Sequence, residues 1–213
     1  MTSPQRALIV VDVQNEYFDG PLEVRYPAPA EALANITAAI DAAEAHDVPV
    51  VVVTHTYPAG SPVFAENSDG WQLHPDLQAR SHPGWKRVSK SVSSALAADG
   101  LAQWIRDNGV DTVSIVGFMT NNCDLATAAH AETLGLSAEV LSDATGAINL
   151  ANAAGTITAE ELHRTLMVLL HSNLAAVGTT ADWMAAVKDG NVLPKSNLVS
   201  SALDGRSGAR DDS

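Results

Sequence analysis

Blocks of apolar residues alternate with amphipathic blocks along the chain, and they predict strands and helices in turn. Continuous β-branched runs, typical of strands buried on both faces of a sheet, cover residues 6–13, 48–56 and 111–117, with shorter apolar runs over 137–144 and 174–178. The stretch that ends at Lys90 is short and could add another strand. The strand pattern therefore favours a sheet rather than a helical bundle.

The amphipathic blocks between these runs predict four helices. Residues 31–46 place Leu33, Ile36 and Ile40 at helical spacing. A second helix is expected to stop at Gly109, and a third to begin near Asn122. The fourth is expected over 158–173, which opens with Thr158 and Glu161 at the spacing of a capping box.

The alternation of strands and helices predicts the fold class. Right-handed βαβ crossovers build a parallel sheet with helices on both faces, so we expect a single doubly wound α/β domain over residues 1–202. The connection over 57–87 is long and rich in proline, glycine and aromatic residues, which predicts a lid or pocket wall. Residues 203–213 are small, polar and charged, and we expect a flexible tail or one that lies on a partner subunit.

Charge and composition exclude several classes of function. The 213 residues carry 12 Lys and Arg against 25 Asp and Glu, a formal net charge of -13, so a surface that binds nucleic acid is not expected. We find no signal-peptide pattern and no apolar run of the roughly 20 residues that a membrane span needs, so a soluble cytoplasmic protein is expected. The single cysteine excludes an internal disulfide framework.

Three residues at predicted strand ends could carry chemistry, because ligands bind beyond the carboxyl ends of parallel strands. They are Asp12, Lys90 and Cys123. Each alone has a commoner explanation. Asp12 could only form a turn, Lys90 could be a solvated charge, and Cys123 could be a small buried apolar residue. Together, a lysine and a helix N-terminus beside Cys123 favour its thiolate, and Asp12 could take the thiol proton and return it to a leaving amine.

The segment before the cysteine suggests an oxyanion hole. Attack on an amide carbonyl creates an oxyanion that needs two fixed N–H donors, and the backbone amides of Met119 and Cys123 are the candidates. Gly117 permits a sharp turn there.

Three motifs in this order resemble the isochorismatase-like cysteine hydrolase superfamily, which includes nicotinamidases, N-carbamoylsarcosine amidases and ureide or maleamate hydrolases. They are ALIVVDVQNEYF, VSKSVSSAL and VGFMTNNCDLATAAHAETLG. The resemblance implies a six-stranded parallel sheet, an Asp-Lys-Cys triad at Asp12, Lys90 and Cys123, and a cis peptide between Phe118 and Met119. It also implies a homo-oligomer, a dimer or larger.

The sequence departs from the resembled family at the metal site and beside the cysteine. Thr56 and Pro58 stand where nicotinamidases carry an Asp-x-His metal-binding pair, so we expect no metal and no other cofactor. A cluster of His55, His74 and His82 is the weaker alternative. Asp124 replaces a residue that is often apolar. A carboxylate there opposes thiolate formation unless it faces away or pairs with a cation, so it either tunes the cysteine or recognises a cationic substrate.

The chemistry predicted is hydrolysis of a C–N bond in a small amide, ureide or lactam through a thioester on Cys123. Isochorismate-cleaving relatives lack the cysteine, which disfavours the alternative of vinyl ether hydrolysis. Two other functions remain as alternative hypotheses: a redox-sensing thiol protein and a purely structural oligomer subunit. Candidate substrate-binding residues, some of which could instead only pack the loops, are Asn15, Phe18, His55, Tyr57, Phe64 and Trp71.

Overall fold

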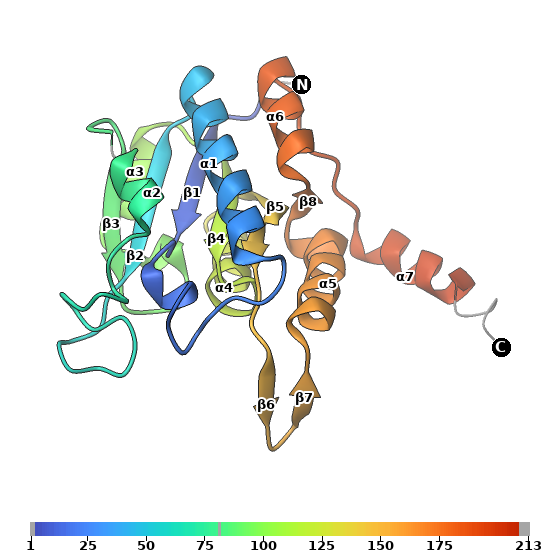
Figure 1. The fold of residues 1–213 in the computed structure, drawn as a ribbon. Coiled ribbons are helices and arrows are strands. Elements are labelled where there is room, and N and C mark those ends of the chain that lie inside the picture. Colours follow the sequence, from blue (N-terminus) through green and yellow to red (C-terminus); the bar gives the residue numbers. More distant parts are fainter. Residues whose placement is uncertain (1–2, 81, 209–213) are drawn as a thin grey trace.

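Six parallel strands form the central sheet of the computed structural model, which describes residues 3–80 and 82–208. The strand order is β3-β2-β1-β4-β5-β8, and each neighbouring pair is parallel (Figure 1). The strands are β1 (Arg6–Val11), β2 (Val50–His55), β3 (Lys86–Lys90), β4 (Thr112–Phe118), β5 (Ser137–Gly146) and β8 (Ala176–Gly178). The predicted doubly wound α/β fold is confirmed, and the stretch that ends at Lys90 is an edge strand of the sheet.

Helices cover both faces of the sheet, because alternate strand residues point to opposite sides. In β1, Leu8 and Val10 pack into the core under α1 (Pro29–Ala45) and α6 (Thr180–Asp189). Ile9 and Val11 pack into the second core, under α3 (Leu101–Asp107) and α4 (Leu125–Thr133). Every residue of β1 is buried, which explains its continuous apolar sequence.

Several elements are absent from the sequence prediction. They are the helices α2 (Pro75–Ala79) and α6, and the hairpin of β6 (Leu150–Asn152) and β7 (Gly155–Ile157) that extends from the body in Figure 1. The start of α6 does carry a readable signal, since Thr179 and Asp182 form a capping box. The predicted capping box of α5 (Ala159–Leu169) is present at Thr158 and Glu161.

The C-terminal segment is more ordered than the predicted tail. Residues 203–208 belong to α7 (Leu198–Gly208), a helix that stands away from the sheet in Figure 1, and residues 209–213 lie outside the described residues. Leu198, Val199 and Leu203 are exposed on it. None of the helices within 3–80 and 82–208 combines the length and apolarity that crossing a membrane requires.

Candidate active site

The carboxyl ends of four adjacent strands bring polar side chains to one buried point. Asp12 follows β1, His55 ends β2, Lys90 ends β3, and Cys123 lies in the π-helical turn Thr120–Asp124 after β4. His55 and Lys90 are register partners on neighbouring strands, so their side chains leave the sheet side by side. The structure thus brings the three residues of the predicted triad together and adds His55 to them.

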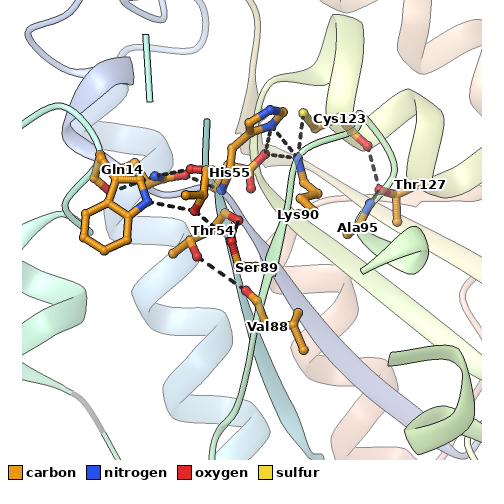
Figure 2. A network of polar contacts seen from close by, with 12 residues as sticks. Gln14, Thr54, His55, Val88, Ser89, Lys90, Ala95, Cys123 and Thr127 are labelled. Carbon is orange, nitrogen blue, oxygen red and sulfur yellow. Dashed lines mark hydrogen bonds and ion pairs between the residues drawn. The ribbon is translucent and has the colours of Figure 1, made fainter. Parts of the chain in front are cut away.

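The ammonium of Lys90 is the centre of this cluster, and Figure 2 shows His55, Lys90 and Cys123 pointing toward one another. Lys90 Nζ lies 2.6 Å from Asp12 Oδ2, 2.9 Å from His55 Nδ1 and 3.3 Å from Cys123 Sγ. Because an ammonium can only donate, Nδ1 of His55 accepts and Nε2 carries the ring hydrogen in the neutral imidazole. That buried Nε2 has no hydrogen-bond partner among the described residues.

The backbone around the cluster has unusual local conformations. Asp12 adopts a left-handed conformation with φ of 51°, held by its N–H bond to Val53 O. Gly117 has φ of 115°, and a Cβ there would lie 2.0 Å from Val11 O, so only glycine lets β4 approach β1 this closely. The peptide between Phe118 and Met119 is cis, as the resemblance implied.

The turn that carries Cys123 is tied to its surroundings by side-chain hydrogen bonds. Thr127 Oγ1 donates to Cys123 O at 2.7 Å and accepts the N–H of Ala95 at 2.9 Å, which links α4 to the segment after β3 (Figure 2). On the other side, Thr120 Oγ1 lies 3.0 Å from His163 Nδ1. The N–H of Met119 donates to no acceptor in the described part of the chain, so it is free to serve as an oxyanion donor.

Burial is the largest influence on the pKa of the nucleophile. It raises the pKa of the Cys123 thiol, and the negative charge of Asp12 raises it further, against a smaller lowering by Lys90. The charge of Lys90 therefore acts in the direction expected from the sequence, but burial and the charge of Asp12 outweigh it. For Lys90 itself, burial lowers the pKa, but the charges of Asp12 and Cys123 outweigh it and the net direction is upward.

Two of the other predicted binding residues contact this cluster directly. The Tyr57 and Phe64 rings contact the His55 ring, with centroids 4.5 and 5.0 Å away, so both border the site. The contacts of the remaining three are with the surrounding loops and with the end of β4: Phe18 packs against Phe118, Asn15 Nδ2 donates to Asp69 O, and Trp71 Nε1 donates to Thr56 Oγ1.

Two residues next to Asp12 contribute more than the sequence analysis assigned. The buried Gln14 side chain donates to the carbonyls of His55 and Trp71 and accepts the His55 N–H, so it fixes the end of β2. Tyr17 is buried against Phe64. Burial raises the pKa of Tyr17, and the charge of Asp12 raises it further. Both residues lie in the motif ALIVVDVQNEYF, which was the available signal.

The donor atoms of the cluster do not suit a metal ion. Ligand atoms of Asp12, His55 and Cys123 lie within 4.8 Å of one another, but the Lys90 ammonium contacts all three and is itself the cation they hold. At the positions that correspond to the metal-binding pair of nicotinamidases, Thr56 Oγ1 is bonded to Ser89 Oγ and to the Trp71 indole, and Pro58 offers no ligand. The residues present therefore fit a lysine-centred site.

Comparison with known proteins agrees with this geometry. The Isochorismatase domain family model matches residues 6–182. The nicotinamidase/pyrazinamidase of Mycobacterium tuberculosis is 31% identical over 184 residues, covering 78% of this chain and 97% of that protein. Among solved structures, an isochorismatase-like protein of Burkholderia xenovorans LB400 is 46% identical, with a TM-score of 0.94 and 100% of both chains covered. An isochorismatase of Pseudomonas putida KT2440 is 27% identical, with a TM-score of 0.77, covering 85% of this chain and 92% of that one.

Proposed function

The chain belongs to the isochorismatase family of hydrolases, and from that premise we propose that it cleaves a C–N bond of a small amide, ureide or lactam by cysteine catalysis. The observation that carries the proposal is the buried Lys90 ammonium, which contacts both the Asp12 carboxylate and the Cys123 sulfur. A nucleophile, an acid-base group and a charge that stabilises both are the parts that acyl transfer requires.

In the first half of the reaction, Asp12 removes the thiol proton while Sγ of Cys123 attacks the carbonyl carbon. The new C–S bond pushes the carbonyl electrons onto oxygen, and the N–H groups of Met119 and Cys123 stabilise the oxyanion. The proton then passes from Asp12 to the leaving nitrogen, the C–N bond breaks, and a thioester remains. Proton removal coupled to attack suits a thiol whose pKa is raised at rest.

In the second half, Asp12 takes a proton from water, and the hydroxide oxygen attacks the thioester carbon. The C–S bond breaks, the acid product leaves, and the sulfur recovers its proton from Asp12. Lys90 stabilises the negative charge as it moves between Asp12 and Cys123, and His55 fixes the ammonium at 2.9 Å. No step in this scheme uses a metal or another cofactor.

The test is an ammonia- and amine-release screen over amides, ureides and lactams, with Cys123→Ala as the control. We expect turnover of at least one class and a loss of at least about a thousandfold in the variant. Mass spectrometry of quenched reactions should show the acyl group on Cys123. Turnover that survives in Cys123→Ala, or no turnover of any class, contradicts the proposal.

The redox-sensor alternative is disfavoured by the environment of the sulfur. Sensor cysteines are exposed thiolates, whereas Cys123 is 1% exposed and burial raises its thiol pKa. Slow reaction with a thiol probe at neutral pH, together with substrate turnover, separates the hydrolase from the sensor. Fast probe labelling without turnover would favour the sensor.

We also propose that copies of the chain associate. Val168 and Leu169 are exposed on α5, and the exposed apolar residues of α7 lie nearby, since α7 packs against the turn after α5. An 11-residue helix whose apolar residues are exposed is only marginally stable in water, so we propose that a second copy covers these residues of α7. Light scattering tests this, and Leu198→Glu/Leu203→Glu should shift the mass toward a monomer.

A further inference from the structure

Asp124 is a buried carboxyl group for which the catalytic scheme has no use. Its side chain is completely buried, and neither carboxyl oxygen has a hydrogen-bond partner in the described ranges. Buried polar groups in native proteins are almost always paired, so an unpaired carboxyl needs an explanation. Glu139 shows the ordinary situation, since its buried carboxylate binds Arg6, Ser114 and Trp183.

The unpaired groups of the molecule collect at the active site. Six buried side-chain atoms lack a hydrogen-bond partner among the described residues, and five of them belong to Asp12, His55 and Asp124. Asp12 forms an ion pair with Lys90, but His55 Nε2 and the Asp124 carboxyl group have no hydrogen-bond partner among the described residues. Asp124 directly follows Cys123, at the end of the turn that carries the nucleophile. A bound substrate is the partner that would satisfy these groups together.

We propose that the Asp124 carboxyl group recognises the substrate, and that it selects uncharged molecules that carry a second amide-type group near the scissile bond. The proposal rests on the proposed function, because it assigns the substrate class of the same site. A second amide-type group places a C=O acceptor beside an N–H donor. A carboxylic acid presents the complementary O–H donor and C=O acceptor, so two parallel hydrogen bonds can form.

The charges around Asp124 favour an uncharged substrate over a cation. Burial raises the pKa of its carboxyl group well above the usual range, and the charge of Asp12 raises it further, against a smaller lowering by Lys90. Because a buried carboxylate without a cation or hydrogen-bond partner is very costly, the unpaired Asp124 side chain is better accommodated as the neutral acid. To pair with a cationic substrate, the Asp124 carboxyl group would have to lose its proton near the negatively charged Asp12. Asp12 does not need a second cation, because Lys90 Nζ already lies 2.6 Å from its Oδ2.

The experiment compares succinamide, which has two amide groups, with pentanamide, which has the same chain length and one amide. A third probe, 4-aminobutanamide, carries a cation instead of the second amide. We expect the wild type to favour succinamide by at least about tenfold in kcat/KM, and Asp124→Leu to lower the succinamide-to-pentanamide ratio by about tenfold. Asp124→Asn keeps a donor and an acceptor and should retain more of the ratio. Asp143→Asn is the matched control, since Asp143 is bonded to Thr180 away from the triad, and should leave the ratio unchanged.

Binding measurements keep this proposal separate from the hydrolase proposal. In the inactive Cys123→Ala protein, calorimetry should show succinamide binding that weakens about tenfold when Asp124→Leu is added. Binding of this kind without any turnover in the wild type would support Asp124 recognition and defeat the hydrolase. A preference for 4-aminobutanamide, an unchanged ratio in Asp124→Leu, or no succinamide binding to Cys123→Ala would overturn the recognition proposal.

Discussion

The sheet carries a buried ion pair at each end, and the two differ in how completely their atoms are bonded. At the amino end, Arg6 and Glu139 are 6% and 3% exposed. Arg6 makes two bonds to Glu139 and one to Asn191 O, and Glu139 Oε2 also accepts from Ser114 and Trp183. At the carboxyl end, the Asp12 and Lys90 pair is equally buried, but Asp12 Oδ1 has no described partner.

This difference separates a structural ion pair from a functional one. A buried charge costs free energy, and a fold recovers that cost only when the remaining hydrogen bonds are also made. The amino-end pair meets this condition within the protein. The carboxyl-end pair leaves acceptors and donors open, which is what a group must do if it is to bind a substrate or carry a proton. The unpaired atoms locate the active site as clearly as the triad does.

The largest effect should come from removing the carboxyl-end pair. The double variant Asp12→Asn/Lys90→Met deletes both charges together, so no unpaired charge stays buried. Activity should fall by at least about a thousandfold, while the free energy of unfolding stays within about 1 kcal/mol of the wild type or rises. Amide turnover and urea denaturation measure the two quantities. A loss of more than about 3 kcal/mol would show that this pair is structural after all.

Breaking the amino-end pair should have the reverse effect. Glu139→Gln leaves the Arg6 guanidinium buried without its counter-charge, and we expect a loss of about 3 kcal/mol in the free energy of unfolding. The kcat/KM of the folded protein should change little, because Glu139 lies at the opposite end of the sheet. Urea denaturation and turnover at low temperature check this. A large drop in kcat/KM with unchanged stability would remove the distinction between the two pairs.

The sequence predicts the features that depend on local pattern, and it does not predict those that depend on contacts between distant segments. The runs at β1, β2 and β4 are readable because both faces of these strands are buried, and Asp12 and Lys90 are readable because they stand at strand ends. The contact of His55 with Lys90 depends on the β2 to β3 register, which no local pattern encodes. The raised pKa of Cys123 depends on burial by distant segments, which outweighs the favourable charge of Lys90 and which the motif alone does not reveal.

Removing the hydrogen bonds of Thr127, which hold the turn of Cys123, should have an intermediate effect on activity and stability. Thr127→Val keeps the side-chain shape but leaves the buried Ala95 N–H without its acceptor and the Cys123 carbonyl without its donor. We expect a loss of about 2 kcal/mol in stability and about tenfold in kcat/KM, because the nucleophile's turn loses its anchor. Thr127→Ser, which keeps the hydroxyl, should recover most of both. An activity loss without any stability loss would place Thr127 in contact with substrate instead.

The smallest expected effect concerns how stability depends on pH. Because the pKa of Asp124 is raised on folding, the folded chain keeps a proton that the unfolded chain releases above about pH 4, so this group lowers stability as the pH rises from there. Asp124→Asn should therefore be more stable than the wild type by about 1 kcal/mol at pH 7, with a smaller difference near pH 4.

Asp182 is the matched control: its bonds to Thr179 lower its pKa, so Asp182→Asn should lose stability at neutral pH. Thermal unfolding across this pH range measures both variants. A gain in stability for Asp124→Asn marks a residue retained for binding rather than for the fold, and a destabilised Asp124→Asn would assign Asp124 to the fold instead.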